Sequence, residues 1–190
     1  MARPNRTEPA LLGLLALQPR SGYEVKGAVE EQLSHFWSES FGNIYPKLRR
    51  LEERGWVECR HEEQEGRPDR KVYSITDAGM DALKGWIEEP IRPQRPRKEL
   101  LLRIFFGPFA SPGVLPAHVR REGERWGTAL EELEAVRSEL QPLPGREGEP
   151  PEQAYWRVTV DYGIRVFRTL VEWADDAASA LEALDRESRA

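Results

Sequence analysis

The sequence predicts a mainly α-helical protein in two parts. Residues 41–56 read as a short helix with one apolar and one basic face; two helical segments precede it and two alternating strands follow it. A Pro-rich stretch then leads into long helical patterns. This order predicts an N-terminal winged helix-turn-helix, with three helices and a two-stranded wing, and an α-helical C-terminal dimerisation domain.

The first two helices are marked by their start signals. Thr7, followed by an acid and a proline, predicts a helix start with Thr7 as the cap, and apolar residues continue to Leu17. Ser21 opens the second helix, and Glu24 three residues later completes a capping box. The apolar face of this helix runs from Val25 to Leu33, and Phe36 could extend it.

The third helix has two contrasting faces. Its apolar face consists of Ile44, Leu48 and Leu51. Its opposite face carries Asn43, Lys47, Arg50 and Arg54. Pro46 fits only in a first turn, so we expect the helix to start within residues 41–43. Gly55 is expected to end it, because glycine tolerates the left-handed backbone that follows many helices.

The wing and a fourth helix follow. Residues 56–61 and 71–75 alternate between apolar and polar side chains, as half-buried strands do, and residues 65–69 have turn composition. Thr76 starts a helix that reaches about Glu89.

Proline recurs every third residue after this helix, with basic residues between and beyond the prolines. We interpret this stretch as a stiff solvated linker, although its basic residues could instead contact DNA phosphates. The predicted domains are a DNA-binding domain over residues 1–90, the linker over 91–98, and a dimerisation domain over 99–190.

The C-terminal part is expected to contain a short helix over residues 99–106 and two long ones over 112–140 and 151–187. The last helix carries a heptad stripe of small and apolar residues, and at roughly 50 Å it is longer than the rest of a small domain can cover. We therefore expect packing on a second chain; a hairpin with the preceding helix is the alternative. The candidate dimerisation residues are Trp156, Val160, Phe167, Leu170 and Leu181.

The composition limits the classes of protein to which this chain can belong. The hydrophobic fraction is 39% and no run of about 18 apolar residues exists, so no membrane span is expected. The N-terminus lacks the apolar segment of a signal peptide, and Cys59, the single cysteine, cannot form an internal disulfide. We therefore expect a cytoplasmic protein. The net charge of −5 arises after residue 75, so a basic surface on the third helix remains compatible with DNA.

Several segments together resemble the PadR family of bacterial transcriptional regulators. Residues 21–25 resemble the opening of the family's second helix, with Ser21 in place of the usual His; residues 40–52 resemble its recognition helix, and residues 66–79 its wing. The C-terminal layout is similar to the branch with a virulence-activator-like domain. The resemblance implies a homodimer that usually represses from a pseudo-palindromic operator on double-stranded DNA. In some members a small aromatic or hydrophobic effector releases the DNA.

The candidate DNA contacts lie on the third helix and the wing. Asn43, Lys47 and Arg50 share the face expected in a major groove, where such side chains read bases or bind phosphates. By resemblance Tyr45 donates to a phosphate, although packing on the second helix would also explain it. Ser40 caps the helix, contacts phosphate, or does both.

Further candidates flank that face. Arg49 lies further round the third helix and could simply pair with Glu52 or Glu53. Basic residues at the wing suit a minor groove or the backbone, unless they belong to an ordinary charged turn. These wing residues are Arg67, Arg70 and Lys71.

No enzyme chemistry is predicted. The three histidines are far apart and lack metal-ligand spacing with Cys59, and neither a phosphate-binding glycine loop nor a serine nucleophile motif is present. We therefore expect no catalytic residue, metal or cofactor. Aromatic residues of the C-terminal part could line an effector pocket, but large aromatics on helical stripes more often form core. They are Trp126, Tyr155, Trp156, Tyr162, Phe167 and Trp173.

Two alternatives remain open from the sequence. The winged helix could be a protein-interaction module without DNA binding, which predicts no salt-sensitive DNA affinity. A MarR-like regulator is the other, but such proteins usually carry dimerising helices on both sides of the winged helix. Only about eight residues precede the first helix here, which argues against it.

Overall fold

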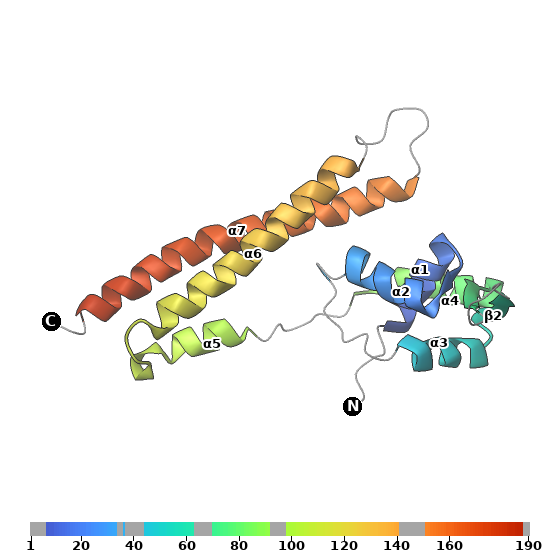
Figure 1. Cartoon of the computed structure of the whole chain (residues 1–190), viewed down its shortest axis with the longest axis horizontal. Coiled ribbons are helices and arrows are strands. Elements are labelled where there is room, and N and C mark those ends of the chain that lie inside the picture. Colours follow the sequence, from blue (N-terminus) through green and yellow to red (C-terminus); the bar gives the residue numbers. More distant parts are fainter. Residues whose placement is uncertain are drawn as a thin grey trace. The chain divides into compact units, whose positions relative to one another are not determined.

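The computed structural model describes residues 7–33, 36, 44–62, 70–91, 98–140 and 151–187. The chain divides into two compact units, Met1–Pro93 and Gln94–Ala190 (Figure 1). Helices dominate the described residues of both units, and the strands described belong to the first unit.

The first unit has the predicted order of three helices, a hairpin and a fourth helix. Its helices are α1 (Thr7–Leu17), α2 (Gly22–Ala28), α3 (Ile44–Glu53) and α4 (Asp77–Glu88), and its strands are β1 (Arg20–Ser21), β2 (Val57–Glu62) and β3 (Arg70–Ile75). This order of elements confirms the predicted winged helix-turn-helix. A π-helical segment, η1 (Val29–Leu33), continues α2 over the residues predicted as its apolar face.

The sheet has three strands, whereas the sequence predicted two. Its order is β1-β3-β2, and both pairings are antiparallel. The additional strand β1 consists of only two residues, which pair with Tyr73 and Val72. Two residues cannot show a period-two alternation, so this strand has no sequence signal of its own. The connection between α1 and α2 becomes a strand only because the edge of β3 is available to pair with it.

The predicted N-caps of α2 and α4 are present, as is the predicted glycine at the end of α3. The N–H of Glu24 donates to Ser21 Oγ at 3.3 Å while the N–H of Ser21 donates to the Glu24 carboxylate at 2.8 Å, which is the predicted capping box. Gly55 follows α3 with a φ of 69°, where glycine is favoured. Thr76 caps α4 by accepting the N–H of Gly79 at 3.1 Å.

The predicted start of α1 at Thr7 is confirmed, because Thr7 is the first residue of the helix, and its side chain is buried at 1% exposure. Its Oγ1 accepts a hydrogen bond from Lys47 Nζ at 2.9 Å, so the hydroxyl contacts α3. Local spacing could not predict this contact, because the two residues are 40 positions apart.

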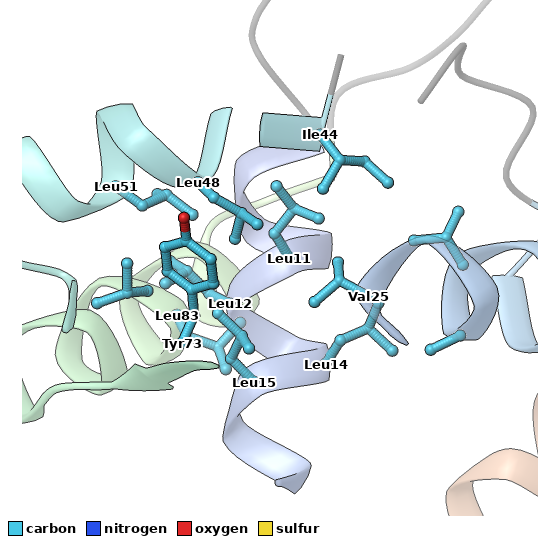
Figure 2. Packing of buried hydrophobic residues seen from close by; sticks show 13 residues of the cluster. Leu11, Leu12, Leu14, Leu15, Val25, Ile44, Leu48, Leu51, Tyr73 and Leu83 are labelled. Carbon is cyan, nitrogen blue, oxygen red and sulfur yellow. The ribbon is translucent and has the colours of Figure 1, made fainter. Parts of the chain in front are cut away.

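The core of the first unit lies between α1 and the elements packed around it, as Figure 2 shows. α1 is apolar nearly all round, and Leu11, Leu12 and Leu15 are among its fully buried side chains. The apolar face of α3 is buried as predicted, with Leu48 and Leu51 at 0% exposure. This burial fixes which face of α3 remains outside.

The second unit is a helical hairpin with a shorter helix against it. It contains α5 (Glu99–Phe105), a 3-10 turn η2 (Gly107–Phe109), α6 (Val114–Glu139) and α7 (Pro151–Glu187), close to the predicted spans. α6 and α7 lie side by side (Figure 1). One apolar cluster joins all three helices around Val119, Ala174 and Ala178. Leu100 and Ile104 of α5 pack against it.

Ion pairs along the hairpin confirm that α6 and α7 run antiparallel. The guanidinium of Arg120, near the start of α6, pairs with Glu182 near the end of α7. Arg137, near the end of α6, pairs with Asp161 at 2.7 Å. In the middle, Leu133 packs so closely on α7 that a Cβ at Gly163 would lie 2.7 Å from its Cδ1.

Candidate nucleic-acid interface

The outer face of α3 is centred on arginines. Residues advance by about 100° along a helix, so Arg49 and Arg50 lie on either side of the direction opposite the buried leucines. The Arg49 side chain is 80% exposed and that of Arg50 is 55% exposed. Arg49 also forms the predicted ion pair with Glu53, at 3.4 Å. Arg49 is predicted to lie further round the helix than the other basic residues, but its side chain is more exposed than those of Arg50 and Arg54.

Lys47 lies at the flank of this face and is half-buried. Its Nζ donates to Thr7 Oγ1, which uses one of the three ammonium donors. The predicted polar face of α3 is therefore turned partly toward the first turn of α1. Lys47 and Arg50 still share one side of α3, as the sequence predicted.

A buried carboxylate holds the C-terminal end of this face. Glu8 of α1 accepts a hydrogen bond from Arg54 Nη1 at 2.8 Å, and its second oxygen lies 3.7 Å from Arg50 Nη2. The guanidinium of Arg54 also lies over the Trp56 ring, 5.0 Å from its centroid. The sequence predicts Glu8 only as an acid in the first turn of α1. Its position in a strongly apolar helix is the one feature of the sequence that indicates its burial.

Tyr45 projects from the first turn of α3 and is 61% exposed. Its ring covers Gly22 at the start of α2, where an added Cβ would lie 2.4 Å from the ring. Tyr45 therefore packs on the second helix and still exposes much of its surface. Both interpretations made from the sequence, packing and a phosphate contact, are compatible with this position.

The base of the wing is tied to α2. Arg70 of β3 pairs with Glu24, the residue that completes the capping box. The Ser21 backbone N–H, followed by Arg70, holds the pKa of the Glu24 carboxyl below its usual value of 4.5. Lys71, the next residue, is exposed. Arg70 thus has a partner within the chain, and Lys71 faces solvent at the wing.

Three predicted contacts, Ser40, Asn43 and Arg67, lie outside the described residues, as does the predicted start of α3 within 41–43. The turn at 65–69 and most of the linker lie outside them too.

The predicted dimerisation residues differ in burial and in contacts within the second unit. Leu181 packs against the apolar cluster of its own chain, and Leu170 lines a cavity. Val160 and Phe167 are half-buried, whereas Trp156 is 43% exposed. The hairpin, the alternative named from the sequence, is therefore formed, but it leaves part of the α7 stripe uncovered.

A cavity of about 810 Å³ opens between α5, α6 and α7. Two of the predicted effector-pocket aromatics, Trp126 and Trp173, meet there with ring centroids 6.2 Å apart. The other four aromatics proposed for a pocket do not line it. Basic side chains at the cavity include Lys98, Arg103 and Arg121.

Two kinds of feature are absent from the described residues. They contain no group of three or more His, Cys, Asp or Glu side chains placed to hold a metal ion. No helix among them combines the length and apolar character needed to cross a membrane.

Known proteins include one relative that matches over nearly the whole chain and another that matches over about half of it. The chain is 27% identical over 183 residues to the probable transcriptional regulator Rv1176c of Mycobacterium tuberculosis, covering 91% of this chain and 96% of that protein. It is 34% identical over 99 residues to the negative transcriptional regulator PadR of Bacillus subtilis, covering 51% of this chain and 54% of that protein.

Solved structures share the fold. The PadR-like transcriptional regulator BC1756 of Bacillus cereus is 28% identical, with a TM-score of 0.78 over 95% of this chain and 98% of that chain. Bacillus subtilis PadR in complex with operator DNA is 23% identical, with a TM-score of 0.77 over 92% and 98%. The same protein has been solved in complex with p-coumaric acid.

Family models cover both units. Residues 11–85 match the transcriptional regulator PadR-like family, and residues 96–182 match the virulence activator alpha C-terminal domain. The chain therefore carries a PadR-like transcriptional regulator domain, followed by a virulence activator alpha C-terminal domain.

Proposed function

We propose that this protein is a cytoplasmic, homodimeric transcriptional repressor that binds a pseudo-palindromic operator through α3 and the wing. The observation that carries the proposal is the outer face of α3, which presents Arg49 and Arg50 beside Tyr45 opposite a fully buried apolar face. A rigid helix with such a face suits a major groove, where arginine reads guanine or binds phosphate.

The relatives support the DNA-binding part of the proposal. PadR of Bacillus subtilis, which shares this fold, is solved with operator DNA and is named a negative regulator. By analogy, Ser40, Asn43, Tyr45, Lys47 and Arg50 would contact DNA from α3 and its approach. Arg67, Arg70 and Lys71 would contact it from the wing.

The C-terminal unit supports dimerisation. Large apolar side chains stay exposed on α7, including Tyr155 at 76% and Tyr162 at 66%. Exposed apolar groups gathered on one helix are typical of an interaction surface. A second copy that covers them would present two α3 helices to successive major grooves, about 34 Å apart.

The cavity beside Trp126 and Trp173 supports a small aromatic effector. Aromatic walls stack on a ring. The cations Lys98, Arg103 and Arg121 exceed the carboxylates Glu99 and Glu122 in the same lining by one charge, which weakly favours a negative group. The ligand of Bacillus subtilis PadR, p-coumaric acid, combines these features and is the probe we would use. Such a ligand can act only by binding one dimer conformation more tightly than another.

Calorimetry with that probe tests the effector. Replacing Trp173 with Leu keeps an apolar wall but removes the ring, so the dissociation constant should rise roughly threefold to tenfold. Trp86→Leu, on α4 and outside the cavity, is the matched control and should bind like the wild type. Equal affinity of both variants would remove this cavity from consideration.

The DNA-binding proposal is tested by selecting bound fragments from the source genome. The Lys47→Ala/Arg50→Ala double variant runs in parallel with Lys84→Ala/Arg125→Ala, which removes the same charge from exposed positions elsewhere. Fragments sharing an inverted repeat, recovered by the wild type and the control but lost with the α3 variant, would support an operator. If none of the three proteins enriches fragments with a shared repeat, two explanations remain: a DNA binder blocked by an effector, or a protein-interaction module without DNA binding.

A further inference from the structure

The first turn of α1 buries two polar side chains, those of Thr7 and Glu8. Thr7 is 1% exposed and Glu8 is 6% exposed, although α1 is otherwise an apolar core helix. Burying a carboxylate is costly unless cations and hydrogen bonds compensate it. The compensation comes from α3, more than 40 residues away in sequence.

The strongest of these contacts fixes Arg54. Its Nη1 donates to the Glu8 carboxylate at 2.8 Å, and its guanidinium lies over the ring of Trp56 at 5.0 Å. A guanidinium held at its edge by a carboxylate and at its face by an indole has little rotational freedom. Arg54 is therefore an anchor that ties the end of α3 to the start of α1.

The contact to Arg50 is looser. Its Nη2 lies 3.7 Å from the other Glu8 oxygen, within ion-pair range but beyond a hydrogen bond, and the side chain is 55% exposed. Arginine carries five N–H donors in a rigid fork. An ion pair at one edge restricts the direction of the guanidinium and leaves donors available to an outside acceptor.

We propose that Glu8 is a positioning residue for DNA recognition, which anchors Arg54 and directs the guanidinium of Arg50 toward the groove. This inference rests on the proposed function of α3. Reading guanine with two hydrogen bonds requires the arginine fork at a defined angle, and a fork already restricted loses less entropy on binding. Thr7 contributes by accepting from Lys47, so one turn of α1 contacts three cations of the α3 segment.

The same carboxylate limits indiscriminate binding. Its negative charge reduces the attraction of Arg50 and Arg54 to any phosphate, and non-specific affinity comes from such attraction. Glu8 therefore raises the ratio of specific to non-specific affinity in two ways, by orienting one arginine and by reducing the net charge of the surface.

The test measures this ratio. The probes are the duplex most enriched in the genomic selection and a shuffled duplex of the same composition, each titrated at several salt concentrations. Glu8→Gln keeps the size and one acceptor oxygen but removes the charge, whereas Glu8→Asp keeps the charge and withdraws it from the arginines. Glu53→Gln is the matched control, because it releases Arg49 of the same helix from a surface ion pair. Thermal unfolding of each variant confirms that it is folded.

Glu8→Gln should bind the shuffled duplex more tightly, with a salt slope steeper by up to about one per released arginine. Its affinity ratio should fall roughly tenfold. Glu8→Asp should lower the affinity ratio without changing the salt slope. This variant therefore separates the effect of the carboxylate's position from that of its charge. It also tests the inference if Glu8→Gln does not fold. Glu53→Gln should steepen the slope and keep the ratio within about twofold of wild type. In an Arg50→Gln background, Glu8→Asp should lower the ratio no further.

Two results would overturn the inference, and they are distinguishable. If the wild type discriminates between the duplexes and both Glu8 variants keep its ratio, Glu8 does not position Arg50, and the proposed function stands. If the wild type itself shows no salt-dependent affinity for either duplex, the proposed function fails together with this inference.

Discussion

The carbonyl oxygen of Trp56 occupies the space where a side chain of Gly79 would begin: a Cβ at Gly79 would lie 2.0 Å from that oxygen. The same carbonyl accepts the N–H of Thr76 at 3.1 Å, so it cannot move without breaking that bond. This contact joins the start of α4 to the segment that links α3 with β2. Glycine at position 79 is therefore required by backbone packing.

Gly79→Ala should destabilise the first unit by roughly 3 kcal/mol, because an added methyl would force these backbones apart. Thermal unfolding followed by circular dichroism measures the change. Gly85→Ala is the control on the same helix: no atom lies within 4 Å of its Cβ position. Alanine is the better helix former, so the control should be neutral or stabilising by up to about 1 kcal/mol. A Gly79→Ala protein as stable as this control would contradict the packing.

Features of the fold that depend on neighbouring residues could be predicted from the sequence. Ser21 and Glu24 are three positions apart, and the spacing alone predicts their capping box. The apolar face of α3 and the end of that helix at Gly55 follow from the same kind of local pattern.

Contacts between distant residues could not be predicted in that way. The pairing of β1 with β3, the bond from Lys47 to Thr7 and the burial of Glu8 all join segments separated by 40 or more positions. Helical periodicity correctly separated the buried face of α3 from its polar face. It could not show that the first turn of α1 would pair with one side of the polar face and leave Arg49 as the outermost cation.

The contacts of the Glu24 carboxylate, first with the Ser21 N–H and then with Arg70, make the stability of the first unit depend on pH. They hold the folded-state pKa of Glu24 below its usual value of 4.5. The unfolded chain therefore binds this proton more readily, so the contribution of these contacts is present above about pH 4.5 and is lost as the pH falls through the lower folded-state pKa. The melting temperature should therefore fall less from neutral to acid pH for Glu24→Gln than for the wild type. Glu30→Gln, which removes an exposed acid of the neighbouring helical turn, should keep the wild-type profile.

The uncovered part of α7 predicts a concentration-dependent dimer. Trp156→Glu places a charge on this exposed surface, and buried tryptophans at interfaces often contribute about 2 kcal/mol or more, so the dimer dissociation constant should rise at least roughly thirtyfold. Sedimentation equilibrium over a range of concentrations measures it. Glu172→Lys, an exposed position on the opposite side of α7, is the control and should leave the constant unchanged. A wild-type protein that stays monomeric at all concentrations would refute dimerisation.

Lys47 has two roles that can be separated experimentally. Its Nζ donates to the buried Thr7 hydroxyl, and in the proposed complex the same ammonium group would bind a phosphate. Lys47→Ala should therefore lower the free energy of unfolding by about 1 kcal/mol and reduce the salt slope of DNA binding by about one. Thr7→Val removes the hydroxyl and keeps the ammonium, so it should reproduce the loss of stability with an unchanged slope. If the slope of Lys47→Ala equals that of Thr7→Val, Lys47 is a structural contact between α1 and α3 and does not bind phosphate.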